Sequence, residues 1–364
     1  MIFDRRDLPE SLPESLPEPL SEPLSEPLSR RRVLSAASAG WLGCIAGHGM
    51  GQGVFMPASA QANPRSLMTD ATVNAIDAGL RYLGDQQNRK DGTFGPLGYG
   101  HNVAVIGIVG LAFLAEGSTP DRGRYADIIR RCIDYILKHC QPSGFIRARG
   151  AGDERPMYGQ GFATLFLAEV YGTTDDARIR EQLGRAVRLI QKVQNEEGGW
   201  RYHPQRESAD ISVTICQIMA LRAARNAGIF VPDRTFERCT QYVKNCQNPD
   251  GGFMYMLSEP GDSQFGRSAA AVVSLNSAGV YEGPEIDKAL TYLANHERDL
   301  FSATGGAYYF YGHYYAVQAM WHAGGRRWSS WYQQVRDLLL AEQKPDGKWV
   351  DSIDESNAYA TAMA

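Results

Sequence analysis

Residues 194–200 read QNEEGGW, and related stretches recur along the chain. The closest copies are QNPDGGF at residues 247–253 and QKPDGKW at residues 343–349. Looser copies occupy residues 87–94 and 141–145, and a sixth, without the glutamine, occupies residues 302–309. Their shared glycine recurs at intervals of 52, 54, 53, 54 and 42 residues, at Gly92, Gly144, Gly198, Gly251, Gly305 and Gly347. A period of about 50 residues is typical of an array or a ring of like units.

Each unit combines two kinds of apolar pattern. The residues before the glutamine are amphipathic, with apolar side chains at three- and four-residue spacing, which predicts a helix with one solvent-facing side. After a variable loop comes a more uniformly apolar stretch, such as VAVIGIVGLAFLA from Val103, which predicts a helix buried on all sides. Alternation typical of strands is almost absent. The sequence therefore predicts an all-α domain of six helical hairpins, in which the glutamine loops serve structure.

The ends of the hairpin array indicate how it closes. An open superhelix needs polar capping repeats at both ends, but both flanking hairpins are as apolar as the middle ones. We therefore expect an α/α-toroid, an α6/α6 barrel with six inner helices inside six outer ones. The last inner helix begins near Asn357 and the sequence stops at Ala364, so this helix is expected to be shorter than the others.

The first 62 residues differ in composition from the rest. Residues 11–29 form a Pro/Glu/Ser/Leu low-complexity tract that cannot bury a core. Paired arginines, a mildly apolar stretch and a small-residue end at 58–62 follow, a pattern that resembles a twin-arginine export signal. An uncleaved membrane anchor is the alternative. We expect a low-complexity tract plus signal over residues 1–62, the toroid over residues 63–364, and export to a periplasmic or other extracytoplasmic space.

Composition excludes several classes of partner. The formal net charge of −4 gives no indication of nucleic-acid binding. No run of 18 apolar residues follows the N-terminal region, so the toroid is not expected to be an integral membrane domain. Five cysteines follow residue 62 without a Cys-x-x-Cys pair, and their repetition on helices favours buried packing over a disulfide or metal site. No metal and no cofactor is expected.

The starts of the inner helices carry the candidate site. Three of them read Tyr-Gly-polar, at residues 99–101, 158–160 and 311–313. In a ring, equivalent positions of six inner helices converge on one axis, with the helix N-termini adding positive potential. Alignment predicts a polar collar at the mouth of an aromatic cavity, made by His101, Gln160, Ser212, Arg267, His313 and Asn357, with Tyr158 and Tyr311 beside it. For Ser212 and Asn357, ordinary helix capping is the competing interpretation.

These loops and inner helices resemble the prenyltransferase and squalene oxidase repeat. That repeat builds the α/α-toroids of squalene–hopene cyclases and of protein prenyltransferase β subunits, and the resemblance covers roughly residues 70–364. It implies an apolar, isoprenoid or lipid-like small molecule bound in a central cavity.

The resemblance also implies catalytic candidates. Squalene–hopene cyclases protonate an alkene with the middle acid of an Asp-x-Asp-Asp-Thr motif, whereas residues 210–214 read DISVT, with Ser212 in the donor's place. Protein prenyltransferases hold zinc with an Asp-x-Cys pair and a histidine. His313 matches that histidine, but Phe265 and Arg267 replace the pair. The candidate roles are Asp210 as acid, His313 or His101 as base or second acid, and Arg267 as partner of an anion.

Two further functions stay open. A non-catalytic binding module would use the toroid as a scaffold that recognises a peptide or a glycan. A polysaccharide lyase or hydrolase on the same barrel would need paired carboxylates or a Tyr/Arg/His set, for which Tyr158, Arg267 and His313 are the candidates.

Overall fold

The computed structural model describes residues 67–95, 98–150, 154–296, 309–352 and 356–364. The chain divides between Ala46 and Gly47, and only the second unit contains described residues. The tract and export signal predicted for residues 1–62, and the sixth loop predicted at 302–309, therefore lie outside the described residues, apart from Tyr309.

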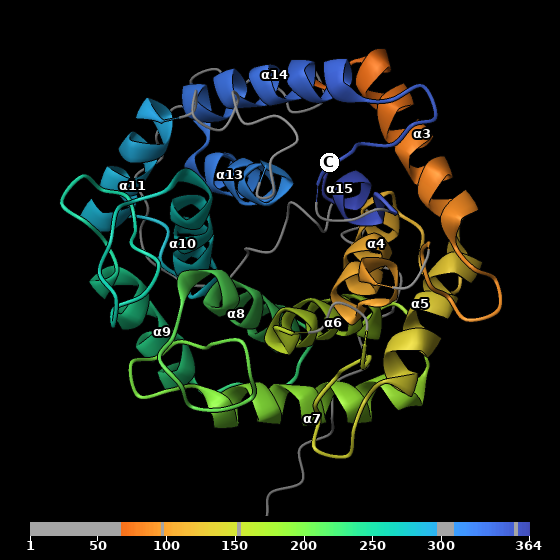
Figure 1. Cartoon of the computed structure of the whole chain (residues 1–364), viewed down its shortest axis with the longest axis horizontal. Coiled ribbons are helices and arrows are strands. Elements are labelled where there is room, and N and C mark those ends of the chain that lie inside the picture. The colour runs from red at the N-terminus through yellow and green to blue at the C-terminus, as the bar shows by residue number, and fades with distance from the viewer. Residues whose placement is uncertain (1–66, 96–97, 151–153, 297–308, 353–355) are drawn as a thin grey trace, which may run out of the picture. The chain divides into compact units, whose positions relative to one another are not determined.

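Within the described unit, two concentric layers of helices alternate along the chain (Figure 1). The outer layer consists of α3 (Asp70–Gln86), α5 (Ala126–Lys138), α7 (Ala177–Val193), α9 (Asp233–Asn245), α11 (Pro284–Asn295) and α14 (Gly325–Glu342). The inner layer consists of α4 (Val103–Ala115), α6 (Pro156–Tyr171), α8 (Ile211–Asn226), α10 (Phe265–Ser277), α13 (Tyr309–Ala323) and α15 (Ala358–Met363). The described residues form isolated β-bridges but no strand. The all-α toroid prediction is confirmed.

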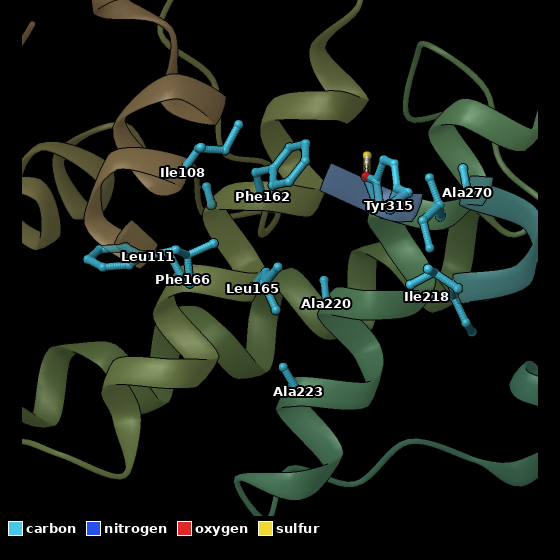
Figure 2. Packing of buried hydrophobic residues seen from close by; sticks show 14 of the residues in the cluster. Ile108, Leu111, Phe162, Leu165, Phe166, Ile218, Ala220, Ala223, Ala270 and Tyr315 are labelled. Atoms are coloured by element: carbon cyan, nitrogen blue, oxygen red, sulfur yellow. Dashed lines mark hydrogen bonds between the residues drawn. The ribbon is translucent and has the colours of Figure 1, made fainter. Parts of the chain in front are cut away.

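Burial separates the two layers as their sequences predict. Outer helix α5 buries one face, which includes Ile129, Ile133 and Ile136, and leaves charged residues on the other. Inner helix α6 is buried almost throughout, from Pro156 to Ala168. Each fully buried large apolar side chain stabilises the fold by about 1.5–3 kcal/mol. The two layers therefore share one continuous core. Figure 2 shows the part of this core that lies among the inner helices, including Ile108 of α4, Phe166 of α6 and Ile218 of α8.

Small residues let the inner helices approach closely. A Cβ atom at Gly110 of α4 would lie 2.4 Å from the Phe166 ring of α6. A Cβ atom at Gly161 of α6 would lie 2.6 Å from Cys216 of α8. The glycines therefore set the spacing of the inner layer.

Four of the described repeated loops bond to the outer helix that follows along the chain or around the ring. The Gln194 side chain donates to the Gly198 carbonyl of its own loop at 2.8 Å and to the Thr235 carbonyl of α9 at 3.0 Å. Gln87 makes the equivalent bond to α5, and Gln247 makes it to α11. Trp200 donates its ring N–H to the Ile190 carbonyl at 2.8 Å. The loops are thus structural, as predicted.

The same bond joins the last repeat to the first. The Gln343 amide donates to Gly347 in its own loop at 2.9 Å and to the Ala75 carbonyl of α3 at 2.8 Å. The short helix α15 packs against α3 and α4. The ring therefore closes at a join of the same chemistry as the others, and the last inner helix is short, as predicted.

The described cysteines are free thiols. Cys132, Cys216, Cys239 and Cys246 are buried, and Cys140 is partly buried. These placements agree with the predicted packing role. No helix in the described ranges combines the length and the hydropathy needed to cross a membrane.

Candidate functional site

A cavity of about 490 Å³ lies between the first turns of the inner helices. Its wall is formed by α4, α6, α8, α13 and α15 and by the segments that precede α4 and α6. The aromatic lining residues are Tyr99, Tyr158, Phe162, Tyr311 and Tyr359. The other lining residues are Asn102, Ala104, Val105, Ile108, Glu154, Arg155, Ser212 and Met363. The cavity is therefore mainly aromatic and aliphatic, with a few polar groups.

Gln160 lies on the side of α6 that faces away from this cavity. Tyr158 and Phe162 are one turn apart and both line the cavity, whereas two residues rotate a helix by about 200°. Gln160 is fully buried, accepts from the Ile146 amide at 2.9 Å and donates to the Gly144 carbonyl at 3.2 Å. It holds the preceding loop, so the predicted collar position of Gln160 is wrong.

Hydrogen bonds in other repeats show which inner-helix residues are truly equivalent, and they differ from those aligned from the sequence. Thr214, Ser268 and Thr361 use their hydroxyls as Gln160 uses its amide oxygen. They accept from the backbone amides of Trp200, Phe253 and Trp349 at 3.1, 2.9 and 3.1 Å. Gln160 is therefore equivalent to Thr214, and Tyr158 to Ser212. The alignment of the Tyr-Gly-polar stretch with residues 210–212 was displaced by two residues.

The predicted collar position of His313 is wrong for the same reason. It follows Tyr311 by two residues on α13 and is 5% exposed. Its ring centroid lies 4.5 Å from that of Tyr309 and 6.3 Å from that of Trp331 on α14. Burial lowers the pKa of His313 to about 4, so the imidazole is neutral at pH 7. His313 packs between the helix layers and is not among the described residues that line the cavity.

Asp210 begins α8 as its N-cap. Its Oδ1 accepts from the Val213 amide at 2.8 Å, and its Oδ2 lies 3.5 Å from Nη1 of Arg201. The side chain is fully buried. Burial raises the pKa of Asp210 to about 6, although the Val213 amide and the Arg201 charge oppose the rise. The carboxylate is therefore engaged in the fold, and it does not belong to the described wall of the cavity.

Ser212 stands on the cavity wall beside Tyr311. Burial raises the pKa of the Tyr311 phenol well above its ordinary value, and a hydrogen bond with Ser212 partly offsets that rise. Asp210 caps α8, so capping does not explain Ser212. Ser212 is the single member of the predicted collar among the described lining residues.

The remaining collar residues lie outside the described wall. His101 ends the short helix η1 (Tyr99–His101), and its carbonyl accepts from the Tyr135 hydroxyl at 2.5 Å. Asn357 occupies the N-cap position of α15 with a φ of 55°, but its side chain does not cap the helix. Arg267 is partly buried and lies over the Tyr255 ring, 5.6 Å from its centroid. The predicted positions of His101, Asn357 and Arg267 on the wall are wrong, because helix starts and loop lengths differ between repeats.

Arg267 instead belongs to an alternating stack of guanidinium groups and phenol rings. Arg155 and Arg201 lie 4.6 and 4.5 Å from the Tyr202 ring centroid, and Arg201 and Arg267 lie 5.7 and 5.6 Å from that of Tyr255. We call Arg155, Tyr202, Arg201, Tyr255 and Arg267 the arginine–tyrosine stack. Such contacts contribute about 0.5–2 kcal/mol each. Because Arg155 also lines the cavity, the stack places positive charge beside the cavity.

Sequence reasoning missed the tyrosines of the arginine–tyrosine stack and a buried acid further along α6. Tyr202 and Tyr255 each follow the aromatic residue of a repeated loop by two positions, so the repeat itself carried a signal for them. Glu169 shares a helix face with Tyr158 and Phe162, about three turns after Tyr158. Burial raises the pKa of Glu169 to about 7. Its signal was a lone acid inside an apolar helix.

Part of the chain is similar to a known enzyme. A curated relative, the drimenyl diphosphate synthase of Streptomyces showdoensis, is 27% identical over 150 residues. The match covers 41% of this chain and about a quarter (26%) of that relative's length.

Two solved structures resemble the fold. A variant of the type II terpene cyclase MstE from Scytonema, in complex with merosterolic acid A, has a TM-score of 0.52 and 15% identity, covering 77% of this chain and 82% of the other. The GH76A alpha-1,6-mannanase from Salegentibacter sp. HEL1_6 has a TM-score of 0.56 and 10% identity. The match covers 81% of this chain and 98% of the mannanase chain. Likeness at these identities shows the fold alone.

The family comparison covers more of the sequence. Residues 102–306, over half of the chain, match the family described as the prenyltransferase alpha-alpha toroid domain. The matched range contains helices of both layers and most of the cavity wall. The chain therefore belongs to the prenyltransferase alpha-alpha toroid domain family.

Proposed function

We propose that this protein binds an apolar, isoprenoid-like small molecule in its central cavity. The observation that carries the proposal is the aromatic wall formed by Tyr99, Tyr158, Phe162, Tyr311 and Tyr359. The volume of about 490 Å³ falls within the range of small-molecule sites. Aromatic faces suit an unsaturated hydrocarbon chain because they bury large apolar area.

The related proteins support an isoprenoid over other apolar ligands. The curated relative is named a drimenyl diphosphate synthase. The terpene cyclase MstE has been solved with geranylgeranyl dihydroxybenzoate as its substrate and with merosterolic acid A as its product. Both ligands join an apolar portion to a polar one.

The cavity offers matching surroundings for a two-part ligand. Phe162, Ile108 and Val105 provide an apolar region one turn inside the helix starts. Arg155 and Ser212 provide polar groups at the helix starts. We propose that the hydrocarbon chain lies against Phe162 and that the polar end points toward Arg155.

The proposed function is binding, because the catalytic candidates are engaged elsewhere. Asp210 is buried as an N-cap beside Arg201, and His313 is packed against Tyr309 and Trp331. Ser212 stands on the wall, but a serine hydroxyl is too weak an acid to protonate an alkene. A glycosidase is disfavoured, since Glu154 is the single carboxylate among the described lining residues and that chemistry needs two.

A cavity-filling variant tests the proposal. Ser212→Trp would place an indole in the cavity from α8, and we expect it to abolish the binding of farnesol and farnesyl diphosphate measured by isothermal titration calorimetry. Ser208→Trp adds the same group at an exposed loop position and is the matched control. Circular dichroism checks that both variants remain folded.

Two results would contradict the proposal. One is a lack of binding of either isoprenoid to the unaltered protein. The other is unchanged affinity in a folded Ser212→Trp variant, which would place the ligand elsewhere.

A further inference from the structure

A second surface stands out at the opposite end of the ring. Phe230 is 81% exposed, more than any other large hydrophobic side chain among the described residues. It lies in the loop between α8 and α9, where an inner helix has ended and an outer helix is about to begin. The cavity lies at the other end, by the inner-helix N-termini. Burial of such a side chain would stabilise a complex by about 1.5–3 kcal/mol, and this free energy is not gained while the ring stays in water.

Phe230 stands between two open grooves. One groove is lined by Arg225, Val231, Pro232, Asp233 and Arg234, and the other by Ala177, Arg180, Glu181, Gly184 and Arg188. Gly228, Ile229 and Phe230 belong to both. The exposed ring therefore lies among four guanidinium groups.

The charge of this surface is positive although the chain as a whole has a formal charge of −4. Helix α7 carries five basic residues and one acidic residue, Glu181. Glu181 pairs with Arg185, and Asp233 pairs with Arg225 at 2.7 Å. Within the described part of the chain, Arg180, Arg188 and Arg234 form no ion pair. Three guanidinium groups thus remain available to an anionic partner.

We propose that this surface docks on a membrane that contains anionic lipids. We name it the Phe230 patch and define it as Arg180, Arg188, Ile229, Phe230 and Arg234. An apolar side chain flanked by arginines is the arrangement that membrane interfaces favour, since the ring enters the acyl boundary while the cations face lipid phosphates. A stable protein interface buries about 800 Å² on each side around a larger apolar centre. The apolar part of this patch is one loop.

The proposal is independent of the ligand proposed for the cavity. Membrane docking depends on the outer surface near α7 and α9, whereas ligand binding depends on the inner wall.

Vesicle co-sedimentation of the full chain tests the proposal. Phosphatidylcholine vesicles are compared with and without phosphatidylglycerol. We expect binding that requires phosphatidylglycerol and weakens as salt screens the charges. Phe230→Ala should weaken the binding by at least about tenfold. The double variant Arg180→Glu, Arg188→Glu should weaken it by more than about tenfold.

Matched controls lie at the other end of the ring. Arg89 and Lys90 are exposed in the first repeated loop, and Val350 is 40% exposed in the last. The double variant Arg89→Glu, Lys90→Glu and the variant Val350→Ala should bind vesicles as the unaltered protein does. The proposal is overturned if no vesicle is bound, if binding ignores phosphatidylglycerol, or if Phe230→Ala has no effect. Retention on heparin without vesicle binding would also overturn it, in favour of a soluble polyanion.

Discussion

The repeated loops and the starts of the inner helices lie close together, yet they differ in how strictly their residues and contacts repeat. Four of the described loops make the same hydrogen bond to the next outer helix, through Gln87, Gln194, Gln247 and Gln343. The helix starts place tyrosine at the equivalent inward position of three repeats, as Tyr158, Tyr311 and Tyr359, but a serine, Ser212, in a fourth. The repeat is therefore kept where backbone groups must be paired, and it is relaxed at Ser212 on the wall for which ligand binding is proposed. Loop substitutions should therefore change stability, and wall substitutions should change binding.

The largest expected effect comes from the loop aromatic. Trp200 is 1% exposed and donates its ring N–H to Ile190. Trp200→Ala should lower the free energy of unfolding by about 3–5 kcal/mol, because it leaves a cavity and an unpaired carbonyl. Ser212→Ala on the wall should lower it by at most about 1.5 kcal/mol, because it removes one hydrogen bond to Tyr311. Chemical denaturation measures both, and equal losses would break the comparison.

Two glycines with the same backbone conformation test how much the contact between loop and outer helix contributes to stability. Gly198 and Gly117 have φ values of 104° and 105°. A Cβ atom at Gly198 would lie 2.1 Å from the Arg238 carbonyl oxygen, whereas nothing lies within 4 Å at Gly117. Gly117→Ala should cost about 1–2 kcal/mol for the backbone alone. Gly198→Ala should cost about 1–3 kcal/mol more because of the clash. Similar melting temperatures for the two variants would show that the contact is unimportant.

Two neighbours on α6 separate stability from binding. Gln160→Ala leaves the Ile146 amide buried and unpaired, so unfolding should become easier by about 1–3 kcal/mol. Its affinity for farnesyl diphosphate should not change. Tyr158→Ala should weaken that affinity, because Tyr158 forms part of the cavity wall. Calorimetry on both folded variants would refute the assigned register if the effects on binding were reversed.

A further expected effect is a pH dependence of stability at Glu169, about three turns along α6 from Tyr158. Burial raises the pKa of Glu169 from 4.5 to about 7. Between these values the folded state binds more protons than the unfolded state, so stability falls as pH rises through this window. Glu169→Gln should be about 3 kcal/mol more stable than the unaltered protein at pH 8 and equally stable near pH 4. Denaturation curves at both pH values would contradict this if the difference were constant.

The sequence predicted the fold well because its signals repeat. The period of the glycines and the glutamine loops indicated hairpins, and the apolar ends indicated closure, which Gln343 and Ala75 carry out. The site was predicted less well, because an alignment of similar residues does not fix which face of the helix each residue occupies. Tyr158 and Gln160 were both assigned to the cavity, although neighbours two positions apart on a helix point in opposite directions. Arg155 lies in a variable loop segment, where no periodic pattern indicates position.

The contact between the last loop and the first outer helix affects how the protein unfolds. In a linear stack of repeats, the terminal units have one neighbour and fray first. Here the bond from Gln343 to Ala75 gives α3 a neighbour on each side. Backbone amides near this seam should therefore exchange with deuterium as slowly as those elsewhere in the ring, through one shared opening rather than progressively from a free edge.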